Sequence, residues 1–117
     1  MLVVDDEPAL RMLVGDVLRD LGYDVMEAAD GPEGLHILES KQDIDLLVSD
    51  VGLPGGMNGR QLADAARVYR PGLKVLFITG YADSAAWEGG VPDPDMQVLT
   101  KPFALDVLTA KVEAMMC

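Results

Sequence analysis

Residues 46–55 read Leu46-Leu47-Val48-Ser49-Asp50-Val51-Gly52-Leu53-Pro54-Gly55. An apolar run leads to one aspartate, and a Pro-Gly turn follows. This pattern is typical of a buried strand of a parallel sheet that ends at a carboxylate, after which the chain turns away. Because an isolated ionised carboxylate is costly to bury, Asp50 needs cations nearby. The alternative at this point is that Asp50 only caps a turn.

The composition is that of one acidic domain. The chain has 117 residues, 50% of them hydrophobic, and 20 acidic against 9 basic residues give a formal net charge of -11. This length supports one core but not a second domain, so we expect a single domain over residues 1–117. The charge argues against binding to nucleic acid or an anionic membrane, and it suits a bound cation or a partner with a basic surface.

Three features predict a cytoplasmic protein. Cys117 is the single cysteine, so no disulfide can form within the chain, as is usual in a reducing compartment. No apolar run approaches the roughly 20 residues that span a bilayer. Met1 leads directly into an apolar strand and not into a basic segment, so we expect no signal peptide.

Strand and helix patterns alternate five times along the chain. We expect strands at 2–4, 23–28, 46–50, 75–78 and 96–100, and helices at 8–21, 31–40, 59–70, 84–88 and 105–115. This alternation predicts an α/β fold with helices on both faces of a parallel sheet. The first, third and fourth strands each contain a continuous apolar run, which places them inside the sheet. Right-handed crossovers then give a flavodoxin-like, doubly wound sheet of order 2-1-3-4-5 with five helices.

Local signals mark several helix ends. Asp30 and Asn58 are residues of the kind that cap a helix N-terminus, and Gly22 is a natural stop for the first helix.

Four polar groups follow directly after strands: the acidic run 5–7, Asp50, Thr79 and Lys101. In a sheet of this order they meet at one edge, near the switch point between the first and third strands. Clustered carboxylates repel one another, and a hard divalent ion with oxygen ligands, most simply Mg²⁺, would relieve that repulsion. A carboxylate beside Mg²⁺, a lysine and a hydroxyl is arranged to attack phosphorus and form an aspartyl phosphate. Taken singly, Thr79 could be an ordinary strand-end residue and Lys101 a solvated charge.

These residues resemble the receiver domains of two-component response regulators. The resemblance spans the chain in order and rests on Val3-Val4-Asp5-Asp6-Glu7-Pro8, Asp30-Gly31, Asp50-Val51-x-Leu53-Pro54-Gly55, Thr79-Gly80 and Lys101-Pro102-Phe103. It implies that Asp50 accepts a phosphoryl group from a phosphohistidine on a histidine kinase or a histidine phosphotransfer protein. It also implies a cis peptide bond between Lys101 and Pro102.

The resemblance assigns roles to the other site residues. Lys101 would contact the phosphate, and Thr79 would reorient to bond it. Asp6 would ligate Mg²⁺ directly and Asp5 largely through water. The full set of implied Mg²⁺ ligands is Asp5, Asp6, Asp50 and the backbone carbonyl of Gly52.

The sequence departs from the usual receiver pattern at the switch position. Val98 stands three residues before Lys101, where receivers usually have an aromatic residue. The run 77–81, Phe-Ile-Thr-Gly-Tyr, resembles a receiver subgroup with a Phe-x-Thr-Gly-Tyr loop. Tyr81 is therefore the candidate replacement: it could act as the switch, shield the phosphate from water, or be only a surface aromatic.

The loop at 53–59 is longer than is usual and resembles receivers attached to hybrid histidine kinases. We therefore expect either a single-domain regulator or a part of a hybrid kinase, and the position of the first strand almost at residue 1 favours the second. Phosphorylation would shift the face around strands four and five, through which a homodimer could form. His36, the single histidine, lies on a predicted helix away from the strand ends and is not expected to be a phosphodonor.

Two other functions are considered. An aspartate-nucleophile phosphohydrolase of the haloacid-dehalogenase type also uses Asp, Thr or Ser, Lys and Mg²⁺. Its nucleophile, however, follows the first strand in an Asp-x-Asp pattern, whereas here Asp5 and Asp6 are adjacent and Asp50 follows the third strand. A receiver that binds partners without phosphate would not need the acceptor chemistry that is present. We therefore expect an acceptor, with possible autodephosphorylation, and not an enzyme.

Overall fold

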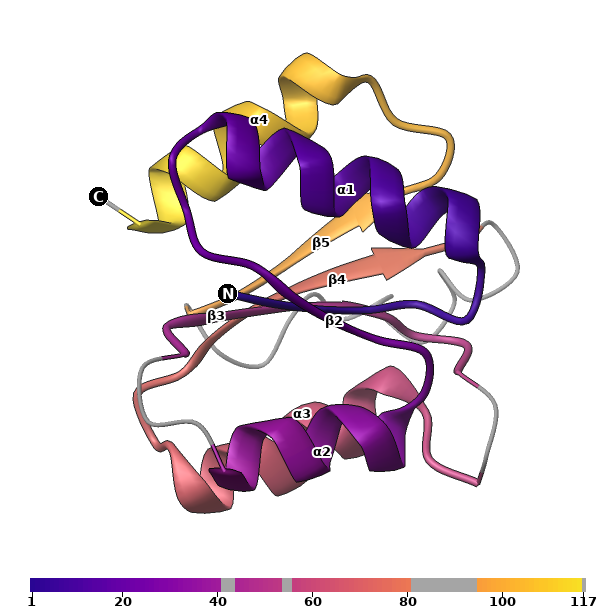
Figure 1. Ribbon diagram of the computed structural model, residues 1–117, viewed down its shortest axis with the longest axis vertical. Coiled ribbons are helices and arrows are strands. Elements are labelled where there is room, and N and C mark those ends of the chain that lie inside the picture. The colour runs from indigo at the N-terminus through magenta and orange to yellow at the C-terminus, as the bar shows by residue number, and fades with distance from the viewer. Residues whose placement is uncertain (41–43, 54–55, 81–94, 117) are drawn as a thin grey trace.

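Five parallel strands form one sheet in the order β2-β1-β3-β4-β5 in a computed structural model of the protein (Figure 1). The structure describes residues 1–40, 44–53, 56–80 and 95–116. The strands are β1 (Leu2–Val4), β2 (Met26–Ala28), β3 (Leu46–Asp50), β4 (Lys74–Thr79) and β5 (Met96–Thr100). The predicted strand order is confirmed, and the three apolar runs are the interior strands.

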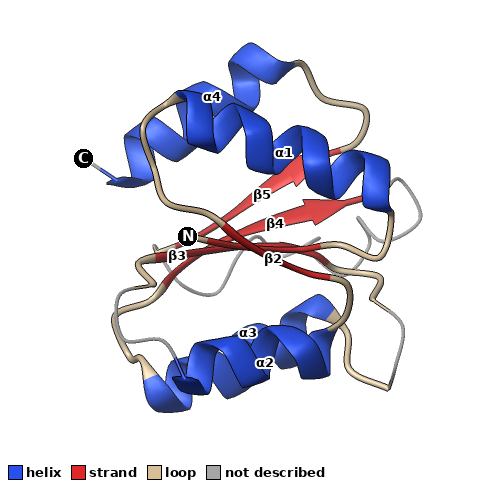
Figure 2. Cartoon of the chain, viewed as in Figure 1, coloured by secondary structure: helices blue, strands red, loops and turns tan. Residues whose placement is uncertain are grey.

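Helices cover both faces of the sheet. They are α1 (Pro8–Asp20), α2 (Gly31–Ser40), α3 (Gly59–Tyr69) and α4 (Leu105–Met116). Helices α1 and α4 lie on one face and α2 and α3 on the other, which gives three layers (Figure 2). The described part of the chain thus contains four of the five predicted helices. The fifth, at 84–88, lies outside the described residues and stays a prediction.

The sheet separates two apolar layers. Val3, on β1, packs with Val14 and Leu18 of α1, whereas Val4, its neighbour along the strand, packs with Leu38 of α2. Alternate residues of a strand point to opposite faces, so a strand covered on both sides is apolar along most of its length. Every side chain of β3 is buried. Burial of each large apolar side chain contributes about 1.5–3 kcal/mol, which fixes β3 and the carboxylate at its end.

The predicted helix ends are confirmed. Asp30 Oδ1 accepts a hydrogen bond from the backbone N–H of Glu33 at 2.8 Å. Asn58 and Gln61 form a reciprocal capping box at the start of α3. Gly22 follows α1 with a φ of 95°, a conformation that glycine adopts readily.

The second strand is shorter than predicted. It begins at Met26 and not at residue 23. Just before β2, the backbone carbonyl of Val25 accepts a hydrogen bond at 3.3 Å from Arg19 Nη2, a side-chain atom of α1. Tyr23 and Val25 still pack against the apolar layer under α1 and α4.

Candidate functional site

The register of the sheet brings the candidate residues to one edge. The final pairs along the interior strands are Val4 with Ser49, Asp50 with Ile78, and Thr79 with Thr100. The backbone N–H of Lys101 then donates to the carbonyl of Thr79 at 2.8 Å, which continues the β4–β5 ladder by one step. Asp5, Asp6, Asp50, Thr79 and Lys101 therefore each lie at the carboxyl end of a strand or just after it.

Three carboxylates meet at this edge. One oxygen from each of Asp5, Asp6 and Asp50 lies within 4.8 Å of the other two. The Asp5 and Asp50 residues are buried, with exposed fractions of 2% and 7%, whereas Asp6 is exposed. The three side chains thus present oxygen ligands that could hold a metal ion on a site open to solvent at Asp6.

Both oxygens of Asp50 receive a hydrogen bond. Lys101 Nζ lies 3.1 Å from Oδ2, and the backbone N–H of Gly52 donates to Oδ1 at 3.1 Å. Burial by itself lowers the pKa of Lys101, but the hydrogen bond and charge of Asp50, with further charges from Asp5 and Glu7, raise the pKa above its ordinary value. The lysine therefore stays protonated beside the carboxylate. The Lys101–Pro102 peptide bond is cis, as the resemblance implied.

Asp5 is held in an unfavourable environment for a carboxylate. Burial raises the pKa of Asp5, and the charges of Asp50 and Asp6 raise it further, although the backbone N–H of Glu7 and the charge of Lys101 act in the opposite direction. Glu7 donates that hydrogen bond to Asp5 Oδ1 at 2.9 Å. A cation placed among the carboxylates would remove the repulsion.

Asp5→Asn is expected to stabilise the metal-free protein at neutral pH. Because the folded pKa of Asp5 lies above the ordinary value of 3.8, its carboxylate lowers the free energy of unfolding at neutral pH. That penalty disappears as the pH falls through the folded pKa. Asparagine removes the charge and keeps an oxygen for the Glu7 N–H. In thermal unfolding with a chelator present, the Asp5→Asn variant should have a higher Tm than wild type near neutral pH. The difference in Tm should shrink in acid. A lower Tm for the variant at neutral pH would contradict this prediction.

Thr79 lies at the same edge with its hydroxyl turned to the backbone. The residue is fully buried, and Oγ1 donates to the carbonyl of Gly80 at 3.1 Å. Val98 pairs with Phe77 in the sheet and packs as a half-buried side chain against the layer under α2 and α3. Tyr81, the candidate switch residue, lies outside the described residues.

Gly59 is a site residue that the sequence reasoning missed. Its backbone N–H donates to the carbonyl of Val51 at 2.9 Å, which holds the start of α3 against the end of β3. A Cβ at this position would overlap the backbone carbonyl oxygen of Asp50 and lie 2.9 Å from Ser49 Oγ. Only glycine fits this contact without displacing the strand end that carries Asp50.

Comparison with known proteins agrees with this geometry. Residues 1–113 match the response regulator receiver domain family. Over 117 residues, 99% of the chain, it is 38% identical to the sensor kinase CckA of Brucella abortus, of which it covers 12%. It is 34% identical to the transcriptional regulatory protein GlrR of Escherichia coli over 97% of the chain and 25% of that protein. A crystal structure of the receiver domain from the hybrid histidine kinase CckA superposes with a TM-score of 0.82 at 36% identity, covering 99% of this chain and 97% of that one.

The doubly wound sheet with acidic, threonine and lysine residues at one edge defines a receiver-type fold. The chain belongs to the response regulator receiver domain family. Its homologues include the receiver segments of hybrid histidine kinases and of response regulators. The chain spans only a minor part of the full length of those proteins. These matches give no support to the phosphohydrolase alternative. Within the described ranges, no helix combines the length and the apolar character that crossing a membrane requires.

Proposed function

We propose that residues 1–117 form one phosphoacceptor receiver domain, in which Asp50 takes a phosphoryl group from a phosphohistidine and thereby changes partner binding. The observation that carries this proposal is the contact between Lys101 and Asp50 beside two further carboxylates. The donor would be a histidine kinase or a histidine phosphotransfer protein. We propose the same acceptor role whether the segment is a single-domain regulator or a part of a hybrid kinase. The matching segment occurs in a sensor kinase and in a transcriptional regulatory protein, both much longer than this chain.

The metal in this proposal is Mg²⁺. The proposed ligands are oxygens of Asp5, Asp6, Asp50 and the backbone carbonyl of Gly52. Two buried carboxylates and one exposed carboxylate form a donor set that suits a hard, partly hydrated cation. Burial is the main cause of the raised pKa of Asp5, and the charges of Asp50 and Asp6 add to it, so a bound cation would stabilise the ionised Asp5 carboxylate. When bound, Mg²⁺ would supply positive charge to the carboxylates and to the phosphoryl oxygens.

The residues of the chain carry the transfer itself. One carboxylate oxygen of Asp50 forms a bond to phosphorus while the bond from phosphorus to the imidazole nitrogen breaks, and the electron pair of that bond stays on the imidazole. Lys101 balances negative charge on the phosphoryl oxygens as they approach. Thr79 exchanges its hydrogen bond to Gly80 for one to the phosphoryl group, which shifts the chain after β4. Tyr81 follows two residues later and stays the candidate through which this shift acts.

The test of acceptor function is phosphorylation by a small donor. Incubation of the chain with acetyl phosphate and Mg²⁺ should add one phosphoryl group, measured by intact mass spectrometry. A chelator should prevent the addition. The absence of an adduct on the wild-type chain in the presence of Mg²⁺ would overturn the proposal.

The donor protein must rest on the surface around Lys101, because its phosphohistidine has to reach Asp50. A groove of about 290 Å³ opens beside Lys101 between the start of α1 and the start of α4. Leu13 and Leu105 line it with exposed fractions of 43% and 42%, although both are apolar. We propose that this groove receives an apolar surface of the phosphohistidine-bearing protein.

Leu13→Glu is expected to slow transfer from a phosphorylated histidine phosphotransfer protein by about tenfold or more, as the loss of a central apolar contact does. The rate with acetyl phosphate should stay unchanged, because Leu13 does not contact the carboxylates. Met12→Glu is the matched control, since Met12 is 58% exposed on the same helix and does not line the groove. Equal slowing with both donors, or equal effects of both variants, would contradict this docking surface.

We further propose three properties of the domain. The chain itself acts as an acceptor and not as an enzyme on a separate substrate. Phosphorylation takes place in the cytoplasm, which is supported by the single cysteine. A homodimer through the β4–β5 face forms on phosphorylation, which light scattering with and without acetyl phosphate would detect.

A further inference from the structure

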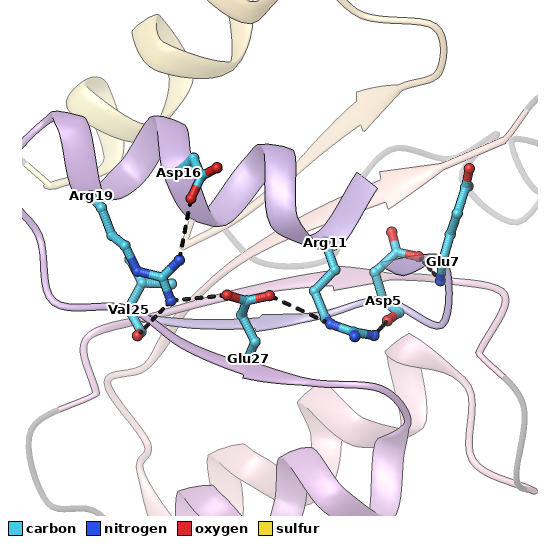
Figure 3. Close-up of polar contacts among 7 residues, drawn as sticks. All are labelled: Asp5, Glu7, Arg11, Asp16, Arg19, Val25 and Glu27. Carbon is cyan, nitrogen blue, oxygen red and sulfur yellow. Dashed lines mark hydrogen bonds and ion pairs between the residues drawn. The ribbon is translucent and has the colours of Figure 1, made fainter. Parts of the chain in front are cut away.

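A chain of polar contacts joins α1 to the edge strand β2. Arg11 Nε lies 3.5 Å from Glu27 Oε1, and Arg19 Nη2 lies 2.9 Å from Glu27 Oε2 (Figure 3). Arg19 also contacts Asp16 at 3.5 Å and is more exposed than Arg11, with side-chain fractions of 43% and 20%. Glu27 thus divides its two oxygens between two arginines of the same helix.

Arg11 continues this chain to the metal-binding carboxylates. Its Nη1 donates to the backbone carbonyl of Asp5 at 2.9 Å. The backbone N–H of Glu7 donates to the side chain of Asp5. Asp5 is therefore held at its carbonyl by Arg11 and at its carboxylate by Glu7 (Figure 3). Of the two arginines, the structure gives only Arg11 a hydrogen bond to Asp5.

Gly15 leaves the space for this arrangement. It lies between Arg11 and Arg19 at intervals of four residues, on the same face of α1. A Cβ at Gly15 would lie 3.2 Å from Arg19 Nη1 and 3.3 Å from Glu27 Oε2, so most side chains there would crowd the ion pair. Glycine destabilises the interior of a helix relative to alanine. At position 15, however, the missing side chain leaves the space that Glu27 occupies.

We propose that Arg11, oriented by Glu27, is a positioning residue that holds Asp5 in place for metal binding and so sets the Mg²⁺ affinity of the site. This inference rests on the proposed function. A metal-ligating residue whose backbone is already ordered loses less conformational freedom when the ion binds. Residues that hydrogen-bond to the metal-ligating residues commonly change the metal affinity. Loss of the positive charge of Arg11 would by itself strengthen binding of a cation, so weaker Mg²⁺ binding without Arg11 reports lost positioning and not a change in charge.

The test is Mg²⁺ binding by isothermal titration calorimetry. Arg11→Met should raise the Kd for Mg²⁺ by about three- to tenfold, the usual effect of losing one hydrogen bond. Arg19→Met is the matched control: it removes the same charge and a contact of Glu27 but no bond to Asp5, and its Kd should stay within about twofold of wild type. Glu27→Gln, which leaves Arg11 without its orienting charge, should give an intermediate Kd.

Phosphorylation kinetics separate positioning from general structural damage. For Arg11→Met, the Mg²⁺ concentration that gives half the maximal rate with acetyl phosphate should rise by the same factor as the Kd. The rate at saturating Mg²⁺ should stay near that of wild type, because Arg11 bonds the backbone carbonyl of Asp5 and the side chain of Glu27. A fall in the saturating rate without a change in the Mg²⁺ requirement would overturn the inference.

The remaining outcomes are also decisive. An unchanged Kd for Arg11→Met, or an equal rise for Arg19→Met, overturns the role of Arg11 while leaving the acceptor function intact. Failure of the wild-type chain to bind Mg²⁺ overturns the metal site itself and is seen in the same titration. If circular dichroism shows that Arg11→Met does not fold, Glu27→Gln decides alone, and a Kd equal to that of wild type overturns the inference.

Discussion

Asp50→Asn is expected to abolish the phosphoryl adduct that the wild-type chain forms with acetyl phosphate and Mg²⁺. An amide lacks the negative charge that makes the carboxylate oxygen a nucleophile, so the bond to phosphorus does not form. Asparagine has nearly the same size as aspartate, and its oxygen can still accept the hydrogen bond from the Gly52 N–H. Intact mass spectrometry should therefore show unmodified Asp50→Asn at a time when the wild-type chain carries one phosphoryl group.

Asp45→Asn is the matched control for this experiment. Asp45 is exposed and lies just before β3, at the end of the strand opposite Asp50. The variant makes the same chemical change and should acquire the adduct as the wild type does. Asp50→Asn should stay folded, because it also removes a charge that repels Asp5. An undiminished adduct on a folded Asp50→Asn protein would place the acceptor elsewhere.

The strand order and the convergence of the site could be predicted because they follow from patterns along the chain. The apolar runs 46–48 and 75–78 indicate interior strands, and their parallel arrangement sends Asp50 and Thr79 to one edge. Local capping chemistry likewise predicted the starts of two helices at Asp30 and Asn58. Each of these conclusions depends on neighbours in sequence or on a general rule of sheet topology.

The features that could not be predicted depend on how the elements pack. Arg11 and Glu27 belong to a helix and an edge strand, and each alone resembles an ordinary solvated charge. Gly59 follows a helix cap, and nothing in its sequence context distinguishes it from a common loop glycine. The direction of the Thr79 hydroxyl depends on which acceptor lies nearest, here the carbonyl of Gly80. Only the packed structure determines these contacts.

Lys101→Met is expected to lower the initial rate of phosphorylation by acetyl phosphate by about a hundredfold or more, the usual loss when one charged group that stabilises a transition state is removed. Lys101 Nζ lies 3.1 Å from Asp50 Oδ2, so in the proposed reaction its charge would lie next to the phosphoryl group that Asp50 accepts. Methionine retains much of the length of the side chain without its charge. The rate is measured by intact mass at saturating Mg²⁺, and Lys111→Met, a change to a half-buried lysine within α4, is the control.

The metal affinity of Lys101→Met identifies the cause of the lost rate. Removal of a positive charge beside Asp50 and Asp5 leaves the carboxylates more negative, so the Kd for Mg²⁺ should fall or stay the same. A slow reaction in a variant that binds Mg²⁺ at least as well as wild type then means that Lys101 acts on the phosphoryl group and not through the metal. A rate within about twofold of wild type would instead show that Lys101 is a solvated charge, and Mg²⁺ alone would have to balance the charge of the transferred group.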